Sequence, residues 1–333
     1  MSNQPSFNRR DILKSIGLTT AGLAISPFLS RMSFAADAPV KKILFFTKSS
    51  GFQHSVIARS ATDPNKLAYA EQILTDLGAK NGFDVTCSKD GSLFTPEYLA
   101  GFDGLVFYTT EDLRKDSPKY SMKAGPDGKK NVPDKLISKE PGMGDAGKAA
   151  FLDAVKNGKG FIALHSGSDT FHGHGKHTKE LLRDVNAAGE DDFDPYIKML
   201  GGEFIVHGAQ QKSTLRCIDD KFPGALALKD ANFSEEWYSL KNFAPDLHVI
   251  LMQDTQGMTG SMYQRKSYPE TWARMHGKGR VFFSSLGHRE DVWKMPGYES
   301  LLVGAMSWVT GRVDADITPN IKDVAPGADP KPF

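Results

Sequence analysis

Short apolar runs alternate with helical repeats along the first half of this chain. Three runs, Lys42–Thr47, Phe102–Tyr108 and Gly160–Leu164, are apolar at almost every position, which is typical of strands buried on both faces of a parallel sheet. Asn65–Lys80 and Lys148–Lys156 carry apolar residues at helical spacing. Strands that alternate with helices build βαβ units. We therefore predict an α/β fold with a doubly wound, mostly parallel sheet and helices on both faces.

The second half of the chain is richer in expected strands. These strands are Gly202–Val206, Ser213–Ile218, Leu247–Leu251, Thr271–Met275 and Arg280–Ser284. Tyr298–Thr310 has the pattern of a closing amphipathic helix. Since no repeat or linker divides residues 39–315, we expect one α/β domain there. A proline-rich, extended tail is expected over residues 316–333.

The N-terminus has the features of an export signal. The pair Arg9-Arg10 is followed by an apolar stretch from Ile16 to about Phe28, and then by small-residue cleavage sites. This order is typical of a twin-arginine signal, and the apolar stretch is too short for a confident membrane span. We predict that residues 1–36 direct twin-arginine export and that the mature protein is periplasmic, with no membrane association after cleavage. The alternative is an N-terminal membrane anchor.

Charge and cysteine content bear on the class of function. The chain has 41 Lys and Arg residues against 40 Asp and Glu residues, so no excess charge points to nucleic acid or an anionic membrane. Cys87 and Cys217 have no metal-binding spacing, and because each lies in an expected strand we predict two buried, unpaired thiols. We expect no nucleotide cofactor, and a homo-oligomer is compatible with the sequence.

Four of the nine histidines lie at or just after the ends of expected strands: His54, His165, His207 and His288. Glu111 follows another strand. Because the carboxyl ends of parallel strands meet at one edge of a doubly wound sheet, these side chains could share a cleft. With a carboxylate such as Glu111, Asp169 or Glu236, neutral imidazoles could hold one divalent transition metal, zinc or similar. Alternatively, the histidines could transfer protons to and from a substrate.

The turn after Gly160–Leu164 has the position of a nucleophile elbow, in which Ser or Cys stands on a tight strand-to-helix turn. Here His165 occupies the nucleophile position, Ser166 is one position away, and no cysteine is near. An acyl-transfer nucleophile is therefore not expected.

Two polar segments, residues 112–144 and 171–192, interrupt the alternation of strands and helices after strand ends. Their length and position are those of binding loops or lids, and the alternative is a solvated insertion. Aromatic residues such as Tyr238 and Trp272 lie near the polar candidates in sequence. Their flat faces suit a pyranose ring, although aromatic residues more often fill the core.

With these residues in view, the chain resembles ThuA-like proteins, the family named for trehalose utilisation. The likeness extends from about Lys41 to Arg312. It rests on Gly51-Phe52-Gln53-His54, Gly160 to His165, Leu200-Gly201-Gly202-Glu203-Phe204, Glu235-Glu236-Trp237-Tyr238, Tyr268-Pro269 with Trp272, and Leu286-Gly287-His288.

The resemblance implies a flavodoxin-like fold, similar to class I glutamine amidotransferases but without their cysteine nucleophile. It also implies a role in disaccharide catabolism through 3-keto-sugar intermediates, with a small-molecule carbohydrate as partner. The family pattern points to His54, His165, His207, Glu236, Tyr238, Trp272 and His288. The insertion over residues 112–144 has no match in that pattern.

The leading hypothesis is a periplasmic enzyme that acts on a sugar or 3-keto-glycoside by hydrolysis, elimination or isomerisation. The predicted catalytic residues are His165, His288, Glu236 and Glu111. The predicted substrate-binding residues are His54, His207, Tyr238 and Trp272, and the predicted metal ligands are His54, His165 and His288. The rival hypothesis is a non-catalytic carbohydrate-binding protein that uses the same cleft. A hydrolase that uses Ser166 is the third.

Overall fold

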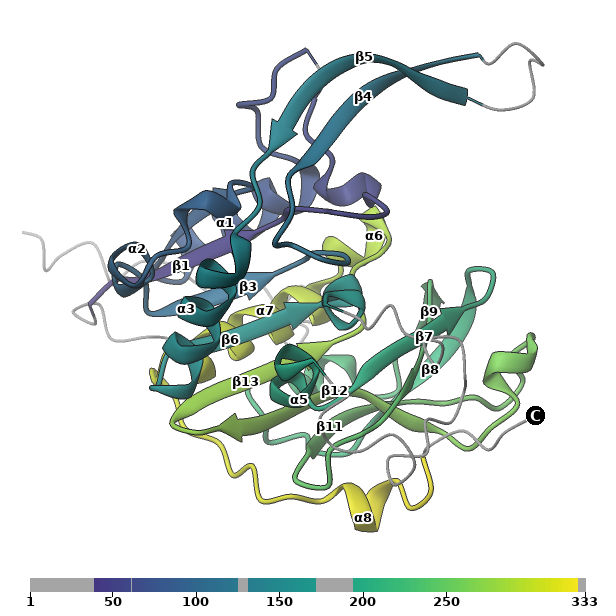
Figure 1. The fold of residues 1–333 in the computed structure, drawn as a ribbon. Coiled ribbons are helices and arrows are strands. Elements are labelled where there is room, and N and C mark those ends of the chain that lie inside the picture. Colours follow the sequence, from purple (N-terminus) through teal and green to yellow (C-terminus); the bar gives the residue numbers. More distant parts are fainter. Residues whose placement is uncertain (1–38, 61, 125–130, 172–193, 329–333) are drawn as a thin grey trace, which may run out of the picture. The chain divides into compact units, whose positions relative to one another are not determined.

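A nine-stranded mixed sheet organises the computed structural model, which describes residues 39–60, 62–124, 131–171 and 194–328 (Figure 1). The strand order is β2-β1-β3-β6-β13-β12-β11-β8-β9. The parallel strands are β2 (Phe83–Ser88), β1 (Lys41–Phe46), β3 (Gly104–Phe107), β6 (Gly160–Leu164) and β13 (Gly279–Ser284). The antiparallel strands are β12 (Tyr268–His276), β11 (His248–Gln253), β8 (Gln211–Cys217) and β9 (Asn232–Glu235). The predicted α/β fold with parallel core strands is confirmed.

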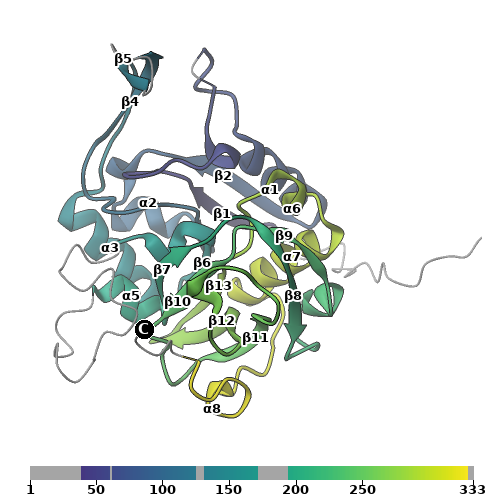
Figure 2. The same ribbon diagram turned by 90° about the vertical axis from the view of Figure 1, so that its right-hand side faces the viewer.

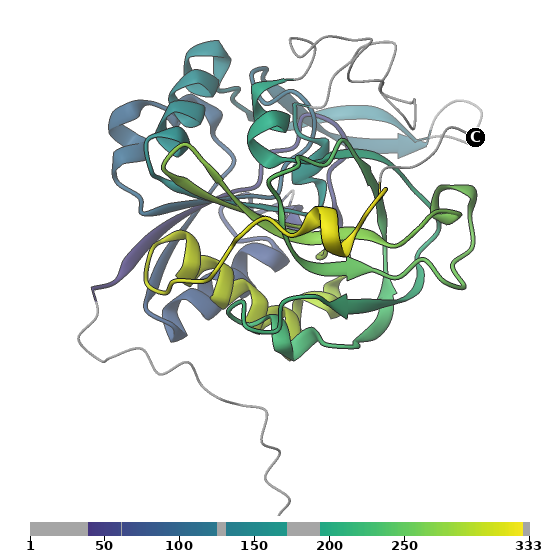
Figure 3. The same cartoon turned by 90° about the horizontal axis from the view of Figure 1, so that it is seen from below.

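Helices cover both faces of this sheet. One face carries α1 (Tyr69–Lys80), α6 (Glu290–Trp293) and α7 (Pro296–Val309). The other carries α2 (Pro96–Ala100), α3 (Gly144–Lys156) and α5 (Pro195–Leu200). From below, Figure 3 shows the yellow-green helix α7 and the teal helix α3 on opposite sides of the strands.

The core consists of two apolar clusters, one on each face of the sheet. Ile43 and Phe45 of β1 belong to the cluster under α7, and Leu44 and Phe46 belong to the cluster under α3. Successive side chains of a strand point to opposite faces, so a strand covered on both sides must be apolar at every position. This burial explains the continuous apolar run that predicted β1.

The insertion over residues 112–144 contains regular structure instead of the irregular loop that its composition suggested. Strands β4 (Ser117–Ala124) and β5 (Asn131–Glu140) form an antiparallel hairpin that stands out from the sheet (Figure 1, Figure 2). Its base is attached to the end of β1, where Lys48 Nζ donates to Glu140 O at 3.0 Å and Lys119 Nζ donates to Ser49 O at 2.6 Å.

Smaller elements complete the fold. Strands β7 (Glu203–His207) and β10 (Tyr238–Lys241) form a separate antiparallel pair. Single 3-10 turns are η1 (Ser55–Ile57), η2 (Gly91–Leu93), η3 (His165–Asp169), η5 (Ala225–Leu228) and η6 (Ser261–Tyr263). The tail expected to be extended contains a short helix, α8 (Ile321–Val324). Cys87 and Cys217 are unpaired, as predicted, but half-buried.

Two predicted segments concern residues that the structure does not describe. The proposed export signal, residues 1–36, lies outside the described residues, as does nearly all of the polar segment 171–192. Within the residues that are described, no helix has both the length and the apolar character needed to cross a membrane.

Candidate metal centre

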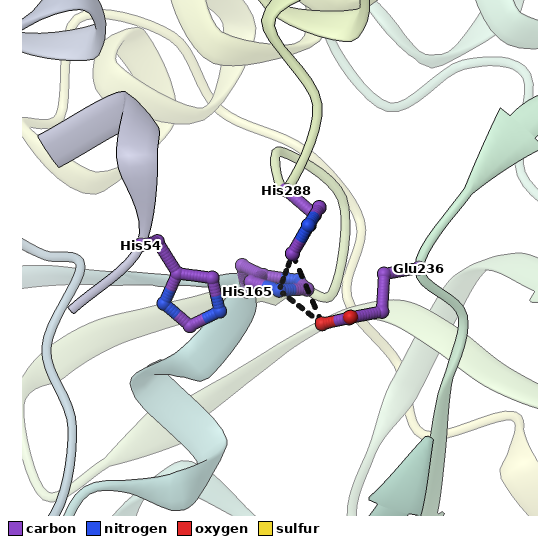
Figure 4. Close-up of side chains that lie close together, drawn as sticks. All are labelled: His54, His165, Glu236 and His288. Atoms are coloured by element: carbon purple, nitrogen blue, oxygen red, sulfur yellow. Dashed lines mark hydrogen bonds and ion pairs between the residues drawn. The ribbon is translucent and has the colours of Figure 1, made fainter. Parts of the chain in front are cut away.

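Three histidines and one glutamate meet at the carboxyl edge of the parallel strands (Figure 4). His54 precedes η1, His165 follows β6, His288 follows β13, and Glu236 lies between β9 and β10. One donor atom from each residue lies within 4.8 Å of the others. His288 Nδ1 is 2.9 Å from Glu236 Oε2 and 3.3 Å from His165 Nε2. The structure thus brings together side chains from four separate parts of the sequence, and we call them the His3Glu group.

His165 stands on a tight strand-to-helix turn, where its φ of 45° lies in the left-handed region. A Cβ at Gly167 would lie 2.8 Å from that of Ala163, so the turn requires glycine there. Ser166 is completely buried, and among the described residues its hydroxyl has no hydrogen-bond partner. Because nothing in this part of the chain would activate or expose that hydroxyl, the Ser166 hydrolase hypothesis loses its support.

The tautomer of His165 follows from its backbone contact. Its Nδ1 lies 2.7 Å from the carbonyl oxygen of Ser285. A carbonyl can only accept, so Nδ1 carries the proton and the Nε2 lone pair faces Glu236 and His288. Burial lowers the pKa of His165, which keeps the imidazole neutral. A neutral histidine fixed by a carbonyl on its other nitrogen is the usual arrangement of a metal ligand.

His54 is also buried and neutral. Burial, followed by the neighbouring His165 and His288, lowers the pKa of His54 to about 2. In the described part of the structure its Nδ1 is buried without a hydrogen-bond partner. Figure 4 shows this nitrogen on the side of the His54 ring away from Glu236, and the other ring nitrogen, Nε2, faces the His3Glu group.

Glu236 and His288 form an ion pair within the group. Burial opposes ionisation of Glu236, but the adjacent His165 and His288 imidazoles hold its pKa well below the usual range. Burial acts against protonation of His288 as well, but the hydrogen bond to Glu236 and its charge raise the pKa of His288. The other carboxylate oxygen of Glu236 lies 3.2 Å from Nδ1 of the half-exposed His207.

A second carboxylate holds the two loops of the group together. The buried side chain of Glu235 accepts hydrogen bonds from the backbone N–H of Glu236 at 2.7 Å and of Gly287 at 3.2 Å. It therefore connects the loop that carries Glu236 to the turn that carries His288. Sequence reasoning missed this role, and the signal available was the adjacent pair Glu235-Glu236 after a strand.

Hydrogen bonds from buried polar groups fix the turn after β13. Ser285 Oγ donates to the buried carboxylate of Glu270 at 2.9 Å. Tyr108 Oη and Trp293 Nε1 both donate to the carbonyl of Gly287, at 3.1 and 2.7 Å. The position of His288 is therefore fixed by contacts that the sequence does not reveal, because their partners are distant along the chain.

Tyr238 and His207, two predicted substrate-binding residues, lie beside the group. The Tyr238 ring packs against His165 with 4.1 Å between ring centroids and against Phe204 with 4.3 Å. His207 stacks on Tyr238 at 5.9 Å, since the two residues pair across β7 and β10. Tyr238 is buried and thus supports the group, whereas His207 faces solvent.

Trp272 is not at the site, contrary to the predicted sugar platform. It is completely buried, its indole Nε1 donates to Leu200 O at 2.8 Å, and its ring packs on Phe283 at 4.3 Å. β12 lies inside the sheet with both faces covered, so its aromatic residue fills the core.

Glu111 is not part of the His3Glu group, contrary to its predicted catalytic role. It is exposed, its φ is 54°, and its backbone pairs with Asp169 O and Phe171 N. Its side chain lies against Gly51, where a Cβ would come within 2.3 Å of the Glu111 carboxylate. The left-handed backbone at this position turns the carboxylate toward a neighbouring loop.

The His3Glu group could hold a metal ion. Imidazole nitrogens and carboxylate oxygens are common ligands of zinc and related divalent metals. Donors that share one tetrahedral zinc ion lie roughly 3.3 Å apart, since each bond is about 2.0–2.1 Å. The separations of 2.9, 3.3 and 3.5 Å among Glu236, His165 and His288 are in that range.

Comparison with known sequences gives a match to one family model. The family model described as ThuA, trehalose utilisation, matches residues 136–309. No curated protein sequence matches the chain.

Among solved structures, a ThuA-like protein from Bacteroides uniformis has a TM-score of 0.53 and 17% identity, covering 87% of this chain and 99% of that chain. A ThuA-like protein from Parabacteroides merdae has a TM-score of 0.50 and 15% identity, covering 84% and 93%. A β-galactosidase from Rahnella sp. R3 has a TM-score of 0.41 and 11% identity, covering 80% and 31%. At these identities the first two structures establish the fold.

Proposed function

This chain belongs to the ThuA, or trehalose-utilisation, family, and from that premise we propose that it is a metal-assisted enzyme that acts on a sugar or 3-keto-glycoside. The observation that carries the proposal is the buried His3Glu group. Two of its histidines are neutral, and a divalent metal would displace the proton that pairs His288 with Glu236. The family description supports a sugar as ligand.

The residues at the site have two proposed roles, metal binding and proton transfer. A divalent transition metal, zinc or similar, would supply Lewis-acid polarisation of a substrate oxygen or an activated water. His54, His165, His288 and Glu236 would hold it. His207 faces solvent and touches Glu236, so it is placed to move a proton at a hydroxyl or at a C–H beside a keto group.

The reaction class follows from that chemistry. A C–H next to a keto group is acidic enough for a positioned base to remove its proton when the carbonyl oxygen is stabilised. Hydrolysis, elimination and isomerisation of a 3-keto-glycoside each use such a step or an activated water.

We further propose, from the N-terminal arginine pair and apolar stretch, that the twin-arginine pathway exports the protein to the periplasm.

Elemental analysis of the exported, purified protein tests the proposal. We expect about one equivalent of a divalent transition metal, lost in His165→Ala and His288→Ala. His276→Ala is the matched control, because His276 lies at the end of β12, outside the His3Glu group. Turnover of 3-keto-glycosides should stop with a chelator and return with the metal.

Other outcomes would contradict the proposal in different ways. Turnover without any metal would leave proton transfer by His and Glu as the mechanism. A sugar that binds without being converted, with or without metal, would instead favour the non-catalytic carbohydrate-binding protein.

A further inference from the structure

An exposed aromatic ring stands beside the His3Glu group. Phe52 is 69% exposed, and among the described residues no other large apolar side chain is as exposed. Its ring centroid lies 5.0 Å from that of His54, in an edge-on arrangement. A single exposed apolar residue is ordinary on a protein surface, so the significance of Phe52 depends on how it is held and what surrounds it.

Hydrogen bonds attach the backbone that carries Phe52 to Thr110, in the segment that follows β3. Thr110 Oγ1 donates to the carbonyl of Phe52 at 3.0 Å and accepts from the N–H of Gly51 at 3.3 Å. The N–H of Ser50 donates to the carbonyl of Thr110 at 3.1 Å. Because three hydrogen bonds to one residue fix this loop, the ring of Phe52 is presented to solvent from a defined position.

A second aromatic wall lies on the other side of the group. Figure 4 shows His54 and Glu236 on opposite sides of His165. Phe52 packs on His54, whereas the stack of Phe204, Tyr238 and His207 lies next to His165 and Glu236. The exposed ring of Phe52 thus contacts one member of the group, His54, and the half-exposed imidazole of His207 contacts another, Glu236.

We propose that Phe52 is the platform on which a pyranose ring of the substrate stacks beside the metal centre. The inference rests on the proposed function. A pyranose with equatorial hydroxyls presents an apolar C–H face to an aromatic ring and directs its hydroxyl or keto groups sideways. With its C–H face on Phe52, a sugar would extend its oxygens toward His54 and His207. Phe52 takes the role that sequence reasoning assigned to Trp272.

The test measures the affinity of the metal-loaded protein for trehalose and for a 3-keto-glucoside by calorimetry. Phe52→Ala should weaken binding by about two- to ten-fold, the effect of losing one aromatic contact, with the metal content unchanged. Phe52→Trp should bind at least as tightly as the wild type. Leu226→Ala is the matched control, because Leu226 is also exposed but lies on η5.

The outcomes separate this inference from the proposed function. If the wild type binds sugar and Phe52→Ala binds it equally well, the platform is wrong and the proposed function stands. If Phe52→Ala loses the metal together with the sugar, Phe52 acts by supporting His54, and the platform is again wrong. If the wild type binds neither sugar, the proposed function fails and the platform with it.

Discussion

At the scale of single residues, the two glutamates predicted to be catalytic have different surroundings. Glu236 accepts from His288 and lies within reach of His165 and His207, whereas Glu111 lies against Gly51 outside the group. Glu236→Gln should weaken zinc affinity at least about ten-fold, because an amide oxygen replaces a charged ligand. Competition with a chromophoric chelator measures this affinity. Glu111→Gln is the matched control, and an equal loss in both variants would contradict the assignment.

The contrast also shows which site residues the sequence could predict. His54, His165 and His288 were predictable because position after a parallel strand determines the edge of the sheet at which a side chain lies. Glu111 shares that position, but its left-handed backbone directs the side chain elsewhere, and no sequence pattern encodes this. Glu235 was missed because its partners, the N–H groups of Glu236 and Gly287, become neighbours only when the fold is complete.

At the scale of elements, the base of the β4–β5 hairpin gathers three lysines around one glutamate, Glu140. Lys89 and Lys119 lie 4.0 and 3.9 Å from the Glu140 carboxylate, and Lys48 donates to the Glu140 carbonyl. Burial lowers the pKa of Lys48 and of Lys89 to about 8, although Glu140 opposes the shift. Of these three lysines only Lys119 belongs to the segment 112–144, and it is largely buried at the base of the hairpin instead of being solvated.

These lysines should make stability depend on pH. The unfolded chain keeps its lysine protons up to about pH 10.4, whereas the folded chain releases two of them near pH 8. Their contribution to the free energy of unfolding therefore rises between these values. The Lys89→Met variant lacks one of these lysines, so its free energy of unfolding should rise less with pH than that of the wild type. Its stability relative to the wild type should therefore fall as the pH increases. Urea unfolding at several pH values between about 7 and 10 measures this difference.

The variant must be compared with the wild type at each pH, because ionisation of Cys87 and Cys217 changes the free energy of unfolding of both proteins in the opposite direction. Burial raises the pKa of both thiols to about 11, so they lower stability as the unfolded thiols ionise near pH 9. Lys66→Met, at an exposed lysine, is the matched control and should follow the wild type at every pH. A Lys89→Met difference that does not change with pH would contradict the account.

At the scale of the whole molecule, the parallel half of the sheet could be predicted, but the arrangement of the antiparallel half could not. The parallel strands are buried on both faces, so their apolar runs are unambiguous, and β6 was predicted with its observed bounds. The antiparallel strands could be recognised singly but not placed, because their order β12-β11-β8-β9 follows from pairing partners and not from local pattern. The short strands β9 and β10, which position Glu236 between them, have too few residues to show a period.

One ion at the His3Glu group would connect parts of the chain that are far apart in sequence. The ligands follow β1, β6, β9 and β13, so binding selects the folded chain and adds to its stability. With free zinc at about 100 times its dissociation constant, the gain is about 2.7 kcal/mol, which corresponds to a rise in Tm of several degrees for a domain of this size. Thermal unfolding with zinc and with a chelator measures the gain. The difference should vanish in His165→Ala and persist in His276→Ala, whereas a wild-type Tm that is insensitive to chelation would show that these four side chains hold no ion.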